Sequence, residues 1–314
     1  MRKTILTIIL LSMSIMFWAI ISPSAKQLTL NHRLNWENFL DIVRVGSTHI
    51  WAVGIGGIIL SSQDGGKHWH KQHCPVDYEW LQGVSFSDSS HGWIAGSEGT
   101  ILSTTNGGET WSGQHLKGAH LMDVLFLSPR FGLTCGLNGQ VFRTENGGSS
   151  WALVNTPTKN IINKMTSFQS DKVWAVGGEG LVLRSLNGGK SWENLKSGSG
   201  ELLYDVCFVD AFHGWICGRA GTVRYTADGG LTWESRKPPT NSELCAIFFI
   251  DQKNGVTVGG AVHGDSPFYT TTDGGLTWHK IETGFETWWK AIHCNSQGEC
   301  LVVGHDLIMN YTLE

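Results

Sequence analysis

Three aspartates occupy equivalent places in a repeated pattern, where a carboxylate could act as a general acid or base or bind calcium. They are Asp64, Asp228 and Asp273, each followed by Gly-Gly and, five residues after the aspartate, by a tryptophan. Three more copies of the pattern carry Asn106, Asn146 and Asn187 at that position. An asparagine amide cannot serve as the acid or base of a carboxyl group. Asp or Asn before Gly-Gly is typical of a tight hairpin turn, so we assign all six a structural role.

The tryptophans of this pattern define an internal repeat. They advance along the chain by 42, 40, 41, 41 and 45 residues, and they are Trp69, Trp111, Trp151, Trp192, Trp233 and Trp278. A second tryptophan position recurs upstream, in segments such as Gly92-Trp93-Ile94-Ala95-Gly96. We expect the tryptophans at both positions to fill the core, because large aromatic side chains dominate core energetics.

Each period reads as four short antiparallel strands, which is the pattern of one propeller blade. An apolar alternation such as Leu203-x-x-Val206-x-Phe208 predicts the first strand of a period, and the glycine-rich turns separate the others. The last segment, residues 300–313, stops where the next repeated turn should begin, whereas Asn31 and Trp36 have the spacing of a degenerate copy. We therefore predict an all-β, seven-bladed β-propeller closed by the N-terminal strand, which pairs in the last blade and leaves no free sheet edge.

The N-terminus resembles an export signal. Arg2 and Lys3 precede an uncharged apolar run from Ile5 to Ile21, and Ser22-Pro23-Ser24-Ala25 provides small residues for cleavage. The run also has nearly the length of a membrane anchor, and both readings stay open. We divide the chain into residues 1–25, a signal peptide or anchor, and residues 26–314, the propeller. Both alternatives place the propeller in a periplasmic or lumenal compartment.

The repeated turn is similar to the Asp-box, or BNR, repeat, and the whole chain resembles one family that contains it. Six boxes of the form Thr-x-Asn/Asp-Gly-Gly-x-Thr-Trp, most of them preceded by a Gly-Trp-x-x-Gly-like stretch, are similar to the photosystem II stability/assembly factor family over residues 30–314. The resemblance implies a non-enzymatic propeller without a cofactor. It also implies binding of membrane-protein subunits or envelope complexes during assembly, and an arginine-bearing face.

One rim of the ring is the predicted binding face, because loops carry function more often than strands do. Trp80 and Trp288 precede the first strands of their blades, so we expect both on the rim formed by the turns between second and third strands. Those turns, together with the arginines suggested by the resemblance, complete a set of candidates: Arg143, Arg184, Arg219, Arg224, Glu98, Glu179, His263 and Asp265.

Cysteine content and charge restrict the remaining possibilities. Cys294 and Cys300 flank a short hairpin and are candidates for a disulfide in an oxidising compartment. The seven cysteines include no Cys-x-x-Cys pair, so we predict no metal site. The net charge of −4 offers no basic stripe for nucleic acid. We expect a monomer with a protein partner.

A sialidase-like glycoside hydrolase, or a carbohydrate-binding Asp-box protein, is the main alternative. Most glycosidases need two facing carboxylates, and sialidases need an arginine cluster with a Tyr-Glu nucleophile pair. Only five tyrosines are present, and the Arg-Ile/Leu-Pro motif of sialidases is missing. We therefore predict no catalytic residue. Binding of a small ligand in the central channel stays open.

Overall fold

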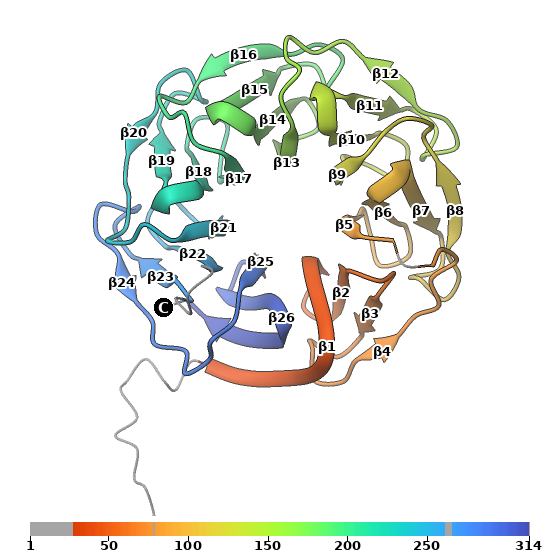
Figure 1. The fold of residues 1–314 in the computed structure, drawn as a ribbon, viewed down its shortest axis with the longest axis horizontal. Helices are drawn as coiled ribbons and strands as arrows, with labels where there is room; N and C mark the ends of the chain where they lie inside the picture. The colour runs from red at the N-terminus through yellow and green to blue at the C-terminus, as the bar shows by residue number, and fades with distance from the viewer. Residues whose placement is uncertain (1–27, 78, 261–265, 314) are drawn as a thin grey trace, which may run out of the picture.

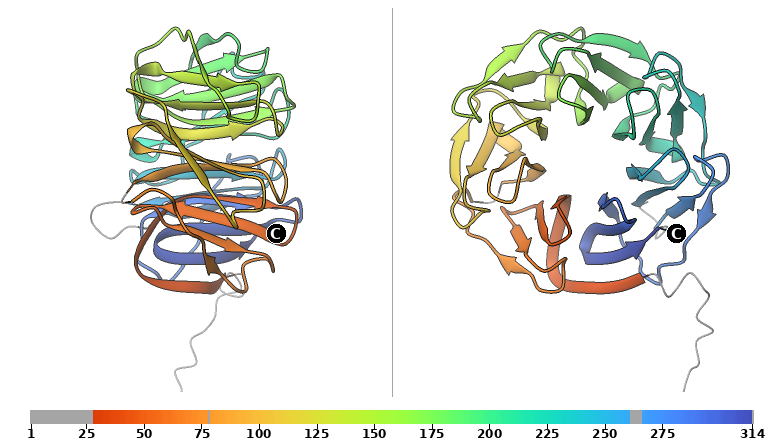
Figure 2. Two further views of the ribbon diagram at one scale, coloured as in Figure 1. Left: turned by 90° about the vertical axis from the view of Figure 1, so that its right-hand side faces the viewer. Right: turned by 180° about the vertical axis from the view of Figure 1, so that it is seen from behind.

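The computed structural model describes residues 28–77, 79–260 and 266–313, which form a closed ring of antiparallel sheets around a central channel (Figure 1). The innermost strands line the channel, and the outermost strands form the outer circumference of the ring (Figures 1 and 2). Within the described residues, no helix is long and apolar enough to cross a membrane. The prediction of an all-β propeller is confirmed.

Five sheets have four strands each. In chain order they are β5 (Leu81–Phe86), β6 (Gly92–Gly96), β7 (Thr100–Thr104), β8 (Ser112–His115); β9 (Leu121–Phe126), β10 (Gly132–Gly136), β11 (Val141–Thr144), β12 (Ala152–Val154); β13 (Ile162–Phe168), β14 (Lys172–Gly177), β15 (Leu181–Ser185), β16 (Glu193–Lys196); β17 (Leu203–Phe208), β18 (Gly214–Gly218), β19 (Val223–Thr226), β20 (Glu234–Ser235); and β21 (Glu243–Phe249), β22 (Gly255–Gly260), β23 (Phe268–Thr271), β24 (His279–Lys280).

The sixth sheet closes the ring and differs from the prediction. Its strands are β25 (Trp289–Cys294), β26 (Glu299–Thr312), β1 (Leu28–Val45), β2 (His49–Gly54), β3 (Ile59–Ser62) and β4 (His70–Lys71). Strand β1 pairs with β26 over its first part, from Leu28 to Asn38, and with β2 from Phe39 onward. The ring thus has six sheets, and the predicted number of seven blades is wrong, because the continuous strand β1 joins the first and last predicted blades into one sheet. The predicted pairing of the N-terminal strand in the last blade is observed between β1 and β26.

The six Asx-Gly-Gly turns share one hydrogen-bond pattern, which explains their composition. In each, a Ser or Thr hydroxyl at the end of the third strand donates to the Asp or Asn side chain two residues later. The same hydroxyl accepts the N–H of the second glycine at 2.9 Å. Both glycines of each turn have positive φ, a region that glycine enters without steric cost.

Tryptophans of the second strands join neighbouring sheets. Trp174 stacks on Phe208 of the next sheet, with ring centroids 3.7 Å apart, and its Nε1 donates to the Gly229 carbonyl in the turn of that sheet at 2.9 Å. Three other tryptophans make the same pair of contacts, namely Trp51, Trp93 and Trp215. The glycine that precedes Trp215 is required, because a Cβ on Gly214 would lie 2.6 Å from the Phe208 ring.

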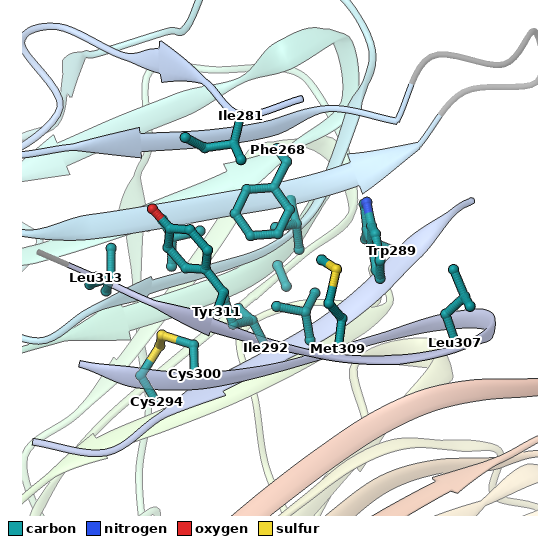
Figure 3. Packing of buried hydrophobic residues seen from close by; sticks show 14 residues of the cluster. Phe268, Ile281, Trp289, Ile292, Cys294, Cys300, Leu307, Met309, Tyr311 and Leu313 are labelled. Atoms are coloured by element: carbon teal, nitrogen blue, oxygen red, sulfur yellow. A yellow bond between two sulfur atoms is a disulfide. The ribbon is translucent and has the colours of Figure 1, made fainter. Parts of the chain in front are cut away.

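The core between the last two sheets uses different side chains. Trp289 and Tyr311, from β25 and β26, lie edge-on to Phe268 of β23, with ring centroids 6.2 and 5.0 Å apart (Figure 3). Met309 fills the space beside them, and all four side chains are buried. This packing holds the closing sheet against its neighbour.

Candidate functional site

The channel contains a cavity of about 650 Å³, lined by the inner strands β1, β5, β9, β13, β17, β21 and β25. Each inner strand carries a register irregularity next to its first core residue, as between Leu81 and Gly83 or between Leu203 and Asp205. This irregular position is equivalent in all seven strands and is occupied by Asp41, Gly83, Asp123, Lys164, Asp205, Ala246 and Ala291. The strands thereby place charged side chains at one level of the channel.

Lys164 is the centre of this charged group. Its Nζ lies 2.9 Å from Asp41 Oδ2 and 3.2 Å from Asp123 Oδ1. Asp41 and Asp123 are buried, and Lys164 is partly accessible from the channel. Strands β5 and β9 lie between β1 and β13 around the ring, so the contact of Lys164 with Asp41 crosses the channel, whereas its contact with Asp123 joins the neighbouring strands β13 and β9.

The three aspartates also bind backbone groups of neighbouring inner strands. Each accepts one N–H from the next inner strand: Val84 N to Asp41 at 2.9 Å, Met165 N to Asp123 at 2.8 Å and Ile247 N to Asp205 at 2.9 Å. Strands β5, β13 and β21 are the innermost strands of their sheets and pair with another strand on one side only, so these bonds satisfy backbone amides on their unpaired side. The carboxylates therefore join pairs of inner strands.

The pKa values reflect this burial. Removal from water raises the pKa of Asp123 and of Asp205 to about 6, against the opposing attraction of Lys164. Burial alone would lower the pKa of Lys164, but the carboxylates of Asp123, Asp41 and Asp205 raise it above its ordinary value. Lys164 therefore stays protonated, and its ammonium group joins the carboxylates of Asp41 and Asp123 from two other inner strands.

The face of the ring formed by the turns between second and third strands holds most of the predicted binding residues; we call it the loop face. Four one-turn 3-10 helices lie there: η2 (Ser97–Gly99), η3 (Leu137–Gly139), η4 (Gly178–Gly180) and η5 (Arg219–Gly221). Glu98 and Glu179, at the tips of η2 and η4, are exposed with positive φ. Trp80 is 51% exposed beside η2, where its backbone N–H donates to Ser97 Oγ.

The mouth of the channel on the loop face combines aromatic and charged groups. Lys290 Nζ lies 3.9 Å from the centre of the Trp288 ring, and Trp288 Nε1 donates to Cys245 Sγ. Arg219 Nε lies 3.3 Å from Glu243 Oε1. Beside them, burial and the Glu243 carboxylate raise the pKa of Tyr204 above its ordinary value. The mouth can therefore offer a stacking surface and both signs of charge to a ligand.

Two of the predicted arginines lie elsewhere. Arg143 and Arg184 are at the far ends of β11 and β15, next to the Asx-Gly-Gly turns and away from η3 and η4. Arg143 Nε donates to the Gly188 carbonyl and Arg184 Nη1 to the Gly229 carbonyl, both at 3.0 Å in the next sheet. Both arginines therefore lie near the Asx-Gly-Gly turns and not beside Trp80 on the loop face. In this sheet Leu133 stands where other second strands carry a tryptophan. Arg143 Nε replaces the indole N–H as the donor to a glycine carbonyl of the next sheet.

The remaining candidates divide as follows. Arg224 donates to the Gly198 carbonyl at 2.5 Å, in a loop on the loop face. His263 and Asp265 lie outside the described residues. Cys294 and Cys300 form a disulfide across the hairpin between β25 and β26. Within the described ranges, no group of three or more His, Cys, Asp or Glu side chains could hold a metal ion.

The charged group in the channel was not predicted from the sequence. Its signal was available, since Asp41, Asp123, Lys164 and Asp205 share one place in the repeat, two residues after the first apolar residue of each inner strand. Aligning the repeats on the first strand, instead of on the Asx-Gly-Gly turn, would have placed them together.

The ring of repeated antiparallel sheets around a lined channel defines the chain as a β-propeller with a repeated Asx-Gly-Gly turn. It belongs to the family described as photosynthesis system II assembly factor YCF48, whose sequence model matches residues 22–120, 117–199 and 194–286.

Solved structures agree in fold. A structure titled "YCF48 bound to D1 peptide" superimposes with a TM-score of 0.78 at 20% identity, over 92% of this chain and 97% of that one. YCF48 from Cyanidioschyzon merolae gives 0.75 at 19%, over 91% and 98%. The WD40 propeller domain of Doa1 gives 0.72 at 13%, over 91% and 97%. No curated protein matches the sequence significantly.

Proposed function

We propose that this chain is a non-enzymatic, exported scaffold that binds a segment of a membrane-protein subunit or envelope complex during assembly. Membership of the YCF48 assembly-factor family carries the proposal. The structure titled "YCF48 bound to D1 peptide" supports it further, since a propeller of the same fold holds a peptide. In this proposal the six repeated turns are Asp boxes with a purely structural role, and the protein acts as a monomer.

The loop face is the proposed binding surface. The exposed indole of Trp80 and the Trp288–Lys290 pair at the channel mouth provide aromatic surface of the kind that dominates peptide binding. Arg219 and Arg224, with Glu98 and Glu179, surround them. Arg143 and Arg184 are excluded from this surface because they bind the turns of neighbouring sheets.

Glycoside hydrolysis is not favoured by the channel geometry. Its aspartates bind Lys164 or backbone amides, so they do not form the free facing pair that hydrolysis requires. Turnover of fluorogenic glycosides by the purified protein would contradict the scaffold assignment.

Photo-crosslinking tests the proposed function. A benzoylphenylalanine placed by Glu98 or Glu179 substitution, on the loop face, should capture an integral membrane subunit from native membranes. The matched controls are Gln63 and Thr105, exposed residues of the Asx-Gly-Gly turns on the opposite face. Capture of the same protein from both faces, or from the control positions alone, would reject the loop face as the binding surface.

A further inference from the structure

The wall of the channel cavity carries more carboxylates than cationic groups. Four carboxylates and two ammonium groups line it, and they belong to Asp41, Asp123, Asp205, Glu243, Lys164 and Lys290. His293 also lines the cavity, but burial lowers its pKa to about 4, so its ring is neutral at pH 7. The cavity therefore has an excess of negative charge.

Three of the four carboxylates have a cation of this chain beside them. Asp41 and Asp123 share the ammonium group of Lys164, at 2.9 and 3.2 Å. At the mouth, Glu243 Oε1 lies 3.3 Å from Arg219 Nε. The excess charge therefore belongs to the fourth carboxylate.

Asp205 is this fourth carboxylate. It accepts the backbone N–H groups of Val206 at 2.8 Å and of Ile247 at 2.9 Å. Among the residues that the structure describes, it forms no ion pair with a Lys, Arg or His side chain, and Lys164 attracts it from beyond ion-pair distance. Charge-assisted hydrogen bonds between a cation and a carboxylate are stronger than those between neutral groups. Asp205 can therefore bind a cationic group of a ligand.

The cavity leaves space for such a group beside Asp205. At the same level, the next two inner strands carry Ala246 and Ala291, whose short side chains line the cavity. Asp205 lies two positions after Leu203, which pairs with Gly218 directly before η5. Because a strand rises about 3.3 Å per residue, Asp205 is about 7 Å below the loop-face end of β17. A group that enters from the loop face can reach it.

The surroundings of Asp205 suit a lysine side chain. Tyr204, Cys245 and Trp288 line this side of the cavity and are partly exposed. A lysine packs its four-carbon stem along such surfaces and presents a compact ammonium group. The carboxylate of Asp205 already accepts two backbone N–H groups, so it suits one ammonium group better than the two parallel hydrogen bonds of an arginine.

We propose that the channel mouth binds a lysine side chain of the partner segment, whose ammonium group pairs with Asp205. The lysine enters from the loop face beside Tyr204 and Trp288 and stops above the ion pairs of Lys164. The partner's identity rests on the proposed function, whereas binding of an alkylammonium group depends on the cavity alone.

Butylammonium chloride tests the site without the partner, since it has the stem and the charge of a lysine side chain. Two-dimensional amide NMR spectra of the full chain report on Val206 and Ile247, which donate to Asp205. We expect saturable shifts of both amides with butylammonium. Butanol, which lacks the charge, and sodium chloride at the same ionic strength should give no saturable shift.

Variants assign the site to its carboxylate. Asp205→Asn should weaken butylammonium binding at least about tenfold. Asp171→Asn, at an exposed aspartate, should bind butylammonium as wild type does. Unaltered amide spectra away from the channel show that the variants fold. Equal shifts with butanol or sodium chloride, no saturable shift with butylammonium, or full binding by Asp205→Asn would overturn the proposal.

Partner capture separates this inference from the proposed function. In loop-face photo-crosslinking, Asp205→Asn should lower the yield of captured partner at least about fivefold relative to wild type. Equal capture by wild type and Asp205→Asn would overturn the lysine contact and leave the scaffold assignment intact. Binding of butylammonium without any capture by wild type would support the site in the cavity and contradict the scaffold assignment.

Discussion

Lys164 Nζ lies 2.9 Å from Asp41 Oδ2, although 123 positions separate the two residues in the chain. Asp41 belongs to the strand that closes the ring, and Lys164 lies on the opposite side of the channel (Figure 1). One ion pair therefore connects the closure of the ring to its far side. Asp123, 3.2 Å from the same ammonium group, extends the connection to a third inner strand.

Removal of this lysine should destabilise the whole ring. In Lys164→Met the buried carboxylates of Asp41 and Asp123 lose their cation, and we expect the free energy of unfolding at pH 7 to fall by about 3 kcal/mol. Urea unfolding measures this change in the free energy of unfolding. Lys159→Met, at an exposed lysine, is the control and should change stability by less than about 0.5 kcal/mol. A loss in Lys164→Met as small as in the control would show that the ion pair contributes nothing.

The raised pKa of Asp205 predicts a pH dependence of stability. Its pKa is about 6 in the folded protein and 3.8 ordinarily, so between these values the folded state holds more protons than the unfolded state. The contribution of this group to stability therefore increases as pH falls through 6. Between pH 7 and pH 5 wild type should gain about 1 kcal/mol from it relative to Asp205→Asn. Asp171→Asn, at an exposed aspartate, should follow wild type; an identical pH profile for Asp205→Asn would refute the assignment.

Substitution of Arg143 and of Arg184 tests whether these arginines stabilise the fold. Arg143→Met removes the side-chain donor that holds the Gly188 carbonyl, whereas in Arg184→Met the Gly229 carbonyl keeps its bond from Trp174 Nε1. We expect the Arg143 variant to be the less stable of the two by about 1 kcal/mol in thermal or urea unfolding. Both should bind the partner normally. If both variants unfolded like the wild type but no longer bound the partner, the arginines would belong to the binding surface.

The disulfide should make the thermal stability of the protein depend on redox conditions. Cys294–Cys300 closes a short hairpin next to the strand that completes the ring, so its loss should cost about 2 kcal/mol. Cys294→Ser/Cys300→Ser should melt about 4 °C below wild type. Reduction should lower the melting temperature of wild type equally and leave the double variant unchanged. Alkylation of both cysteines in protein isolated from its native compartment would contradict an exported, oxidised state.

Local patterns predicted much of this fold because each repeat carries its own structural determinants. Asn106-Gly107-Gly108 and its copies specify a turn by backbone conformation alone, and the tryptophan spacing sets the length of the repeat. The division into sheets was mispredicted, because whether β1 breaks near Asn38 depends on two pairings of one strand with distant partners. The positions of Arg143 and Lys164 were missed because their contacts lie 45 and 123 residues away.

Hydrogen exchange of the full chain, with and without the captured partner segment, tests the scaffold assignment most directly. Binding on the loop face should slow exchange in η2, η3, η4, η5 and around Trp80 and Trp288, while the Asx-Gly-Gly turns exchange as before. Protection of those turns with an unchanged loop face would contradict the account.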